Sequence, residues 1–169
     1  VGESLPEADA YYIGGGYPEV YMDDISENGD FLDGLRQASE EEKLIYGECG
    51  GLMTLCRSIR NGERERRMSG IVPSDAELTS DRQGLAYVEA ECTPSNFLFK
   101  GRIRAHEFHY SRLRPLPPGP YAYKVLRGTG IDGFSDGVVV NRTVGTYMHQ
   151  HALANKNWGA SMVREAGRN

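Results

Sequence analysis

The chain has 169 residues, which is typical of one domain and sufficient to bury a core without disulfides. Nineteen Lys and Arg residues against 24 Asp and Glu residues give a formal net charge of −5 without any basic block, which argues against a nucleic-acid-binding protein. The three cysteines are irregularly spaced, residues 1–10 lack a signal-peptide pattern, and no apolar run approaches the ~20 residues that cross a bilayer, so we expect a cytoplasmic protein without a membrane partner.

Two short apolar runs, 10–13 (AYYI) and 44–46 (LIY), are followed directly by glycine-rich segments, 14–16 (GGG) and 47–51 (GECGG). Apolar runs without alternation are typical of strands that are covered on both faces, as in a parallel sheet. The 21 glycines of the chain, about 12% against a typical ~7%, therefore mark turns at strand ends and not a flexible linker.

Helices are predicted after both of these strands. Residues 30–39 (DFLDGLRQAS) carry an apolar stripe behind Asp30, a candidate N-cap. A second helix is predicted over residues 52–59 (LMTLCRSI), directly after the glycines. The charged segment 61–67 (NGERERR) is expected to be a solvated turn.

The second half of the chain has a different pattern. Segments 83–92 and 102–110 alternate apolar and polar residues, which predicts half-exposed strands. Segment 114–120 holds four of the eight prolines and is expected to be a rigid loop. Two further strands are predicted over 137–141 and 144–149.

A closing helix is predicted over residues 155–166, with three apolar side chains directed inward, namely Trp158, Met162 and Val163. No repeat, low-complexity tract or interdomain linker interrupts residues 1–169, so we interpret them as a single domain. Apolar strands that alternate with helices indicate an α/β fold.

The segment 47–51 has the form G-x-nucleophile-x-G around Cys49. Glycines on both sides avoid clashes at a strained strand-to-helix turn, and the turn places the sulfur at a helix N-terminus, where the dipole favours thiolate. The N–H of Gly50 would face a developing oxyanion. We therefore predict that Cys49 is a nucleophile; the alternative is a buried structural cysteine, which is the role expected for Cys56 and Cys92.

A thiol nucleophile usually needs a base, and His149 is the predicted one because it ends the expected strand 144–149. His151 is the alternative base, since it has the same side-chain parity if that strand continues. No third, orienting acid is evident: a carboxylate is absent two residues after His149, and the side chain of Glu48 is expected to point elsewhere.

Backbone N–H groups of the loop at Gly15 and Gly16 are candidates for a second oxyanion donor, although the glycines also fit a simple turn. The loop is not a phosphate-binding P-loop, because the pattern G-x-x-x-x-G-K-[ST] occurs nowhere in the chain. No metal site is predicted: His106 and His109 would lie on opposite faces of a strand, and no third ligand accompanies the other two histidines.

Four ordered motifs, GGGYPE (14–19), IYGECGGLMTL (45–55), AHEFHYS (105–111) and GTYMHQH (145–151), resemble the glutamine amidotransferase domain of cobyrinate a,c-diamide synthases. That family includes the nickel-sirohydrochlorin a,c-diamide synthases, and the resemblance covers nearly the whole chain. It implies the class I glutamine amidotransferase fold, which is flavodoxin-like, with a mostly parallel sheet flanked by helices and an antiparallel addition.

The resemblance also implies residue roles. Cys49 would attack the side-chain amide of L-glutamine, release ammonia and leave a glutamyl thioester that water hydrolyses, with His149 as the activating histidine. Oxyanion and glutamine-binding roles would fall to Gly15, Gly16, Gly50, His109, Tyr110 and Ser111. The family lacks the third-position glutamate of other triad amidotransferases, and the sequence HQH agrees with that absence.

In the complete synthases, an N-terminal ATP-binding domain activates the a and c carboxylates of a tetrapyrrole, either cobyrinate or nickel-sirohydrochlorin. This chain is therefore expected to be a fragment that lacks the synthetase domain and possibly the first strand and helix of its own domain. No cofactor is expected here, whereas ATP and magnesium are expected for the full-length enzyme. The alternatives are a non-catalytic binding module and another cysteine hydrolase on the same fold.

Overall fold

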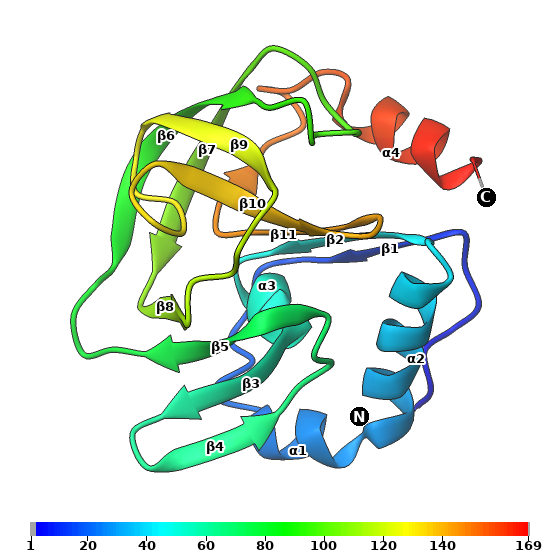
Figure 1. Cartoon of the computed structure of the whole chain (residues 1–169), viewed down its shortest axis with the longest axis vertical. Helices are drawn as coiled ribbons and strands as arrows, with labels where there is room; N and C mark the ends of the chain where they lie inside the picture. The colour runs from blue at the N-terminus through cyan, green and yellow to red at the C-terminus, as the bar shows by residue number, and fades with distance from the viewer. Residues whose placement is uncertain (1–2, 169) are drawn as a thin grey trace.

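Residues 3–168 of the chain, described by a computed structural model, form two sheets with four helices packed around them (Figure 1). The large sheet has, in spatial order, β1 (Ala10–Ile13), β2 (Leu44–Glu48), β11 (Thr143–Thr146), β10 (Ser135–Val140), β9 (Tyr121–Arg127), β6 (Gly84–Cys92), β7 (Arg102–His109) and β12 (His149–Gln150). The small sheet has β4 (Arg64–Arg67), β3 (Cys56–Asn61), β5 (Val72–Leu78) and β8 (Ser111–Arg114). The helices are α1 (Met22–Glu27), α2 (Gly29–Glu40), α3 (Gly50–Leu55) and α4 (Trp158–Ala166).

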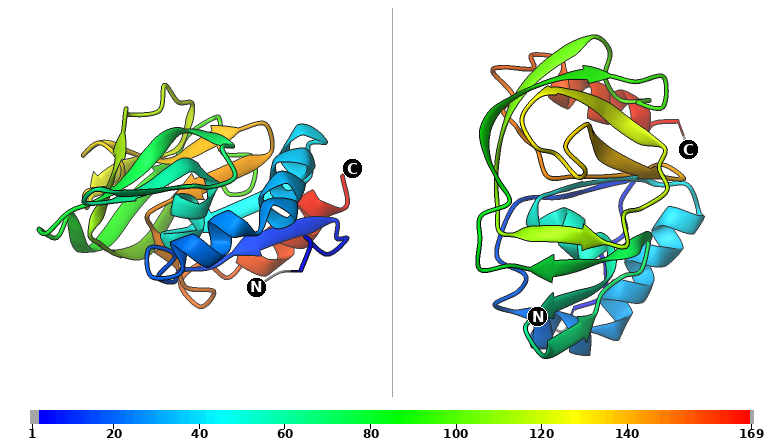
Figure 2. Two further views of the ribbon diagram at one scale, coloured as in Figure 1. Left: turned by 90° about the horizontal axis from the view of Figure 1, so that it is seen from below. Right: turned by 60° about the vertical axis from the view of Figure 1, so that its left-hand side comes forward.

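The parallel part of the large sheet is built on β2, which is buried along its whole length and pairs in parallel with β1 and with β11. Alternate side chains of β2 enter two different hydrophobic clusters: Ile45 packs with Leu35 and Leu52, whereas Leu44 and Tyr46 belong to the second cluster. Helices α2 and α3 cover one face of these strands and α4 covers the other (Figures 1 and 2). The two-sided burial explains why β2 has no polar alternation.

The rest of the large sheet is antiparallel and curls away from the parallel strands (Figure 2). The predicted α/β architecture with an antiparallel addition is thus confirmed, but the sheet is mixed and not mostly parallel, with two parallel pairings and five antiparallel ones among its strands in residues 3–168. The antiparallel addition is therefore larger than the sequence indicated. The alternating segments predicted as half-exposed strands are β6 and β7, which form its longest hairpin.

Three of the predicted elements need correction. The cap of α2 is Asn28, whose side chain accepts a hydrogen bond from the Phe31 N–H at 3.3 Å, so Asp30 lies in the first turn. The helix predicted over 52–59 ends at Leu55, and Cys56 begins β3, which pairs in parallel with β5. The charged segment 61–67 contains strand β4, because pairing with β3 supplies hydrogen bonds that charge patterning does not reveal.

The closing helix α4 begins at Trp158, three residues later than predicted. Trp158 and Met162 face the second hydrophobic cluster together with the buried Glu165, as positions i, i+4 and i+7 of a helix should. Val163 falls outside this stripe and is 74% exposed, so its predicted inward direction is wrong.

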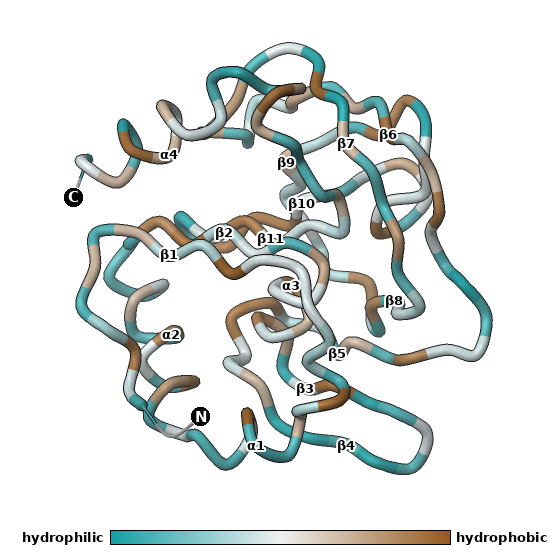
Figure 3. The backbone as a smooth tube through the Cα atoms, turned by 180° about the vertical axis from the view of Figure 1, so that it is seen from behind, coloured by the Kyte–Doolittle hydropathy of each residue, from teal (hydrophilic) through white to brown (hydrophobic). Residues whose placement is uncertain are grey.

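Hydropathy follows this architecture along the chain. Apolar segments gather on the parallel strands at the centre, whereas β4 at the periphery is hydrophilic (Figure 3). None of the helices within residues 3–168 is both long and apolar enough to cross a bilayer.

A test of this packing is the substitution Gly51→Ala. A methyl group at Gly51 would lie 2.2 Å from the carbonyl oxygen of Ile13, a contact that main-chain atoms of β1 cannot avoid without moving. Overpacking of this kind costs about 2 kcal/mol or more of the free energy of unfolding, measured by urea denaturation. The control is Gly29→Ala, where nothing lies within 4 Å and helix propensity favours alanine. Equal stability of the two variants would contradict the packing described here.

Candidate active site

Cys49 occupies a sharp turn between β2 and α3. Its backbone has φ 49° and ψ −99°, a left-handed conformation that is strained for a residue with a side chain. The flanking glycines are required by close packing: a Cβ at Gly47 would lie 2.6 Å from Leu55 Cδ1, and Gly51 lies directly against Ile13. The strained strand-to-helix turn expected around Cys49 is therefore present, and the physical reason given for its glycines is correct.

The carboxyl ends of β2 and β11 bring the predicted nucleophile and base together. Glu48 is the register partner of Thr146, and the N–H of Cys49 donates to the Thr146 carbonyl oxygen at 2.7 Å. Three residues after Thr146, His149 begins β12, where it pairs with His106 of β7. Cys49 and His149 line one pocket of 420 Å³, whose lining residues are Tyr12, Gly15, Gly16, Tyr17, Glu48, Cys49, His106, Phe108 and His149.

The glycine loop after β1 forms another wall of this pocket. A Cβ at Gly15 would lie 2.5 Å from Cε1 of His149, so the loop backbone touches the imidazole edge. A Cβ at Gly50 would lie 2.8 Å from the carbonyl oxygen of Gly16, so the loop also rests on the first residue of α3. The predicted oxyanion donors are thereby adjacent in space, while their role in stabilising an oxyanion stays a prediction.

The Cys49 thiol is 8% exposed and keeps its proton in this environment. Burial raises the pKa of Cys49 to about 11, although a hydrogen bond from the Gly50 N–H acts in the opposite direction. Further increases of this pKa come from the carboxylates of Glu19, Asp136 and Glu48. The expected preference for thiolate is thus not seen, because desolvation outweighs the N-terminus of the six-residue helix α3.

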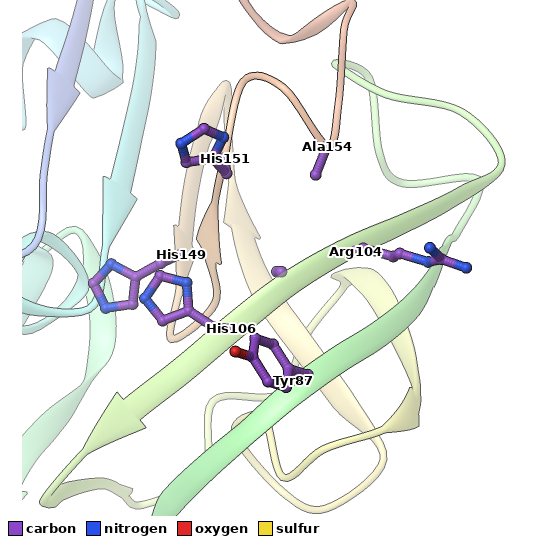
Figure 4. Close-up of a pocket in the computed structure, with 7 residues that line it drawn as sticks. Tyr87, Arg104, His106, His149, His151 and Ala154 are labelled. Carbon is purple, nitrogen blue, oxygen red and sulfur yellow. The ribbon is translucent and has the colours of Figure 1, made fainter.

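His149 is suited to accept that proton. Burial lowers the pKa of His149, and the neighbouring His106 and His109 lower it further. The His106 and His149 rings are stacked, with centroids 4.8 Å apart and planes 10° from parallel. Figure 4 shows the two rings next to each other. A neutral imidazole and a neutral thiol that line the same pocket are what a cysteine–histidine pair needs before proton transfer.

Glu48 does not point away from the site, contrary to the expectation from the sequence. It is 3% exposed and lines the pocket. Its Oε2 accepts a hydrogen bond from the Tyr12 hydroxyl at 2.9 Å, its Oε1 accepts one from the Gln150 N–H at 3.2 Å, and Oε2 lies 3.8 Å from Nδ1 of His149. The signal in the sequence was a carboxylate inside an otherwise apolar buried strand, because such a group needs partners.

The segment 109–111, assigned to glutamine by the resemblance, lies outside this pocket. His109 and Ser111 are buried: the His109 ring stacks on Tyr147 with centroids 3.8 Å apart, and the Ser111 hydroxyl is 3.0 Å from the Tyr147 hydroxyl. Tyr110 is exposed and packs edge-on against Phe108. Binding of glutamine by these three residues stays a prediction. The pocket is also lined by residues to which the sequence analysis gave no role in the site, namely Tyr12, Tyr17, His106 and Phe108.

His151 follows the end of β12 and does not line the pocket at Cys49. The strand predicted over 144–149 breaks after Thr146, and β12 covers only two residues, so the parity that made His151 a rival base does not apply. His151 is exposed and lines a neighbouring pocket together with His149, His106 and Arg104 (Figure 4).

The remaining cysteines are free thiols away from the pocket. Cys56 is fully buried at the start of β3, where its Sγ donates to the Leu52 carbonyl oxygen at 3.3 Å, and Cys92 is half-buried at the end of β6. Among residues 3–168, no three His, Cys, Asp or Glu side chains gather in a group able to hold a metal ion.

Comparison with known proteins identifies the family. A family model described as a CobB/CobQ-like glutamine amidotransferase domain matches residues 1–157. Cobyrinate a,c-diamide synthase of Methanothermobacter thermautotrophicus is 40% identical over 166 residues, which are 97% of this chain and 36% of that protein. The enzyme of the same name from Methanocaldococcus jannaschii is 40% identical over 161 residues, or 94% of this chain and 35% of the relative. The chain thus spans about a third of the length of these relatives.

Solved structures support the fold. A crystal structure of a glutamine amidotransferase superimposes with a TM-score of 0.69 at 17% identity, covering 94% of this chain and 79% of the other. The structure of PurLQS from Thermotoga maritima superimposes with a TM-score of 0.66 at 15% identity, covering 97% of this chain and 81% of its counterpart. At these identities the likeness concerns the fold.

The protonation state of Cys49 gives a prediction. With a thiol pKa of about 11, the thiolate fraction and the rate of alkylation by iodoacetamide should increase about tenfold per pH unit between pH 7 and 10. Mass spectrometry of the peptide that contains Cys49 measures this rate, and the fully buried Cys56 in the same digest serves as an unreactive control. A rate that is already constant above pH 8 would contradict a raised pKa.

Proposed function

Because the chain belongs to the CobB/CobQ-like glutamine amidotransferase family, we propose that it hydrolyses L-glutamine to glutamate and ammonia, with Cys49 as nucleophile and His149 as base. The observation that carries the proposal is the strained turn at Cys49, which opens into the pocket that His149 also lines. The strand-to-helix turn exposes a reactive atom at the end of the sheet, where sites of α/β proteins form.

The proposed reaction has two halves. His149 takes the proton of the Cys49 thiol, and the sulfur attacks the side-chain carbonyl carbon of glutamine. Backbone N–H groups of Gly50 and of the loop at Gly15 and Gly16 stabilise the oxyanion. The intermediate collapses, the amide nitrogen takes the proton from His149 and leaves as ammonia, and a glutamyl thioester remains. Water gives a proton to His149, attacks the thioester carbonyl, and releases glutamate while the proton returns to sulfur.

We further propose that this ammonia serves an ATP-dependent ligase. The relatives are named cobyrinate a,c-diamide synthases, and their greater length leaves room for an ATP-binding synthetase domain. In the proposed reaction, ATP with magnesium activates the a and c carboxylates of a tetrapyrrole, cobyrinate or nickel-sirohydrochlorin, and ammonia converts both to amides. A cytoplasmic location is part of the same proposal.

The central test is glutaminase activity of the purified chain and of Cys49→Ala, measured as glutamate release. The variant should lose at least about 99.9% of the activity, because removal of a covalent nucleophile stops acyl-enzyme formation. A diazo-ketone analogue of glutamine should label Cys49, with Cys56 and Cys92 as internal controls in the same protein. Equal glutamate release by both proteins, or turnover of peptides but not of glutamine, would overturn the proposal.

The assignment of the base gives a separate prediction. His149→Ala should lower kcat by about 10²–10⁴-fold, the contribution of general acid–base catalysis. His151→Ala should keep most of the activity, because His151 lines the neighbouring pocket and not the one at Cys49. The reverse order of the two variants in the same glutamate-release assay would identify His151 as the base.

A further inference from the structure

We propose that Glu48 is the positioning residue for His149. It takes the place of the orienting acid that is absent two residues after His149 in the sequence. The inference rests on the proposed glutaminase function for its catalytic meaning. Its structural content, a carboxylate 3.8 Å from Nδ1 of His149, is independent of that function.

The Glu48 carboxylate lies close to the His149 ring. Oε2 of Glu48 lies 3.8 Å from Nδ1 of His149, and the two side chains are only 4% and 22% exposed. A movement of less than ~1 Å would bring the pair to hydrogen-bond distance, which is a common difference between a free enzyme and its substrate complex. Nδ1 is the ring nitrogen that orienting carboxylates hold in Ser-His-Asp triads, leaving Nε2 to exchange protons with the nucleophile.

The Glu48 carboxylate is itself held by hydrogen bonds from two sides. The Tyr12 hydroxyl donates to Oε2 at 2.9 Å, and the Gln150 N–H donates to Oε1 at 3.2 Å. Burial beside Glu48 raises the pKa of Tyr12 to about 12, so the phenol keeps its proton and remains a donor. Glu48 therefore binds the main chain of the residue next to His149 while it faces the imidazole.

The other contacts of the His149 ring leave the position beside Nδ1 to Glu48. His106 stacks on the face of the His149 ring, and the backbone at Gly15 touches its edge at Cε1. Other titratable or charged groups near His149 are Cys49, His109, Tyr12, and, in the neighbouring pocket, Arg104 and His151. Among the side chains within residues 3–168 that line these two pockets, Glu48 is the carboxylate, and it lies 3.8 Å from the ring, whereas burial, His106 and His109 lower the pKa of His149.

The test compares Glu48→Gln with Glu165→Gln. Both wild-type side chains are 4% exposed, but Glu165 lies in α4 and pairs with arginines, so the control removes an equally buried carboxylate remote from Cys49. Glu48→Gln should lower kcat for glutamine hydrolysis by about 10- to 100-fold with KM unchanged, a part of the ~10²–10⁴-fold effect of the base. Glu165→Gln should leave kcat unchanged.

The pH dependence distinguishes positioning from a structural role. A carboxylate close to an imidazole favours the imidazolium, so its removal should shift the acidic limb of kcat/KM, and the His149 titration followed by NMR, to lower pH by about one pH unit. In Glu48→Asp, which keeps the charge, His149 should titrate close to its wild-type pH. An unchanged limb in Glu48→Gln would overturn the inference.

A measurement on the unaltered protein covers the case in which Glu48→Gln does not fold. In ¹⁵N spectra, neutral His149 should carry its proton on Nδ1, facing Glu48; a proton on Nε2 would overturn the inference. If the wild-type chain shows no glutaminase activity while His149 has this tautomer and its titration depends on Glu48, the proposed function fails and the pairing stands.

Discussion

The site depends on the alignment of two parallel strands. β2 and β11 end at the same level, and the hydrogen bond of 2.7 Å from the Cys49 N–H to the Thr146 carbonyl oxygen fixes that level. Cys49 follows one strand directly, and His149 comes shortly after the other, although 100 residues separate them in the sequence. The remainder of the large sheet curls so that β7 supports β12 and presents His106 to the His149 ring. A change of register between the two parallel strands would separate the proposed nucleophile from the proposed base.

Burial shifts the pKa of an acid and of a base in opposite directions, and both shifts favour the neutral form of the group. It raises the pKa of Cys49 to about 11 from 9 and lowers that of His149. Two pKa units correspond to about 3 kcal/mol against forming the thiolate in the free protein. A thiolate–imidazolium pair of Cys49 and His149 is therefore unfavourable in the free protein. The backbone N–H groups that are proposed to stabilise an oxyanion would act only in the proposed reaction. This limits unwanted reactivity of the thiol.

Local signals in the sequence predicted the parts of this structure that local sterics control. Glycines at 47 and 51 indicated the turn at Cys49 because close packing leaves no room for Cβ atoms there. The helix predicted over 52–59 ends at Leu55, and the turn predicted over 61–67 is confined to residues 62–63, because strand pairing in the small sheet overrides local propensity. The predicted direction of the Glu48 side chain was wrong for a similar reason: its partners come from β1 and β12, and no local pattern shows that residues of these two strands meet at Glu48.

β12 is too short for its own ladder to hold His149, the proposed base, firmly, and a buried polar layer compensates. The Gln150 amide donates to the hydroxyls of Tyr46 at 2.6 Å and Tyr123 at 2.8 Å, so the residue after His149 is tied to β2 and β9. Its main-chain N–H is tied to Glu48. Buried networks of this kind fix one arrangement because each unsatisfied member is costly. The orientation of His149 is therefore determined by side chains that converge on Gln150 and Glu48 more than by the strand to which it belongs.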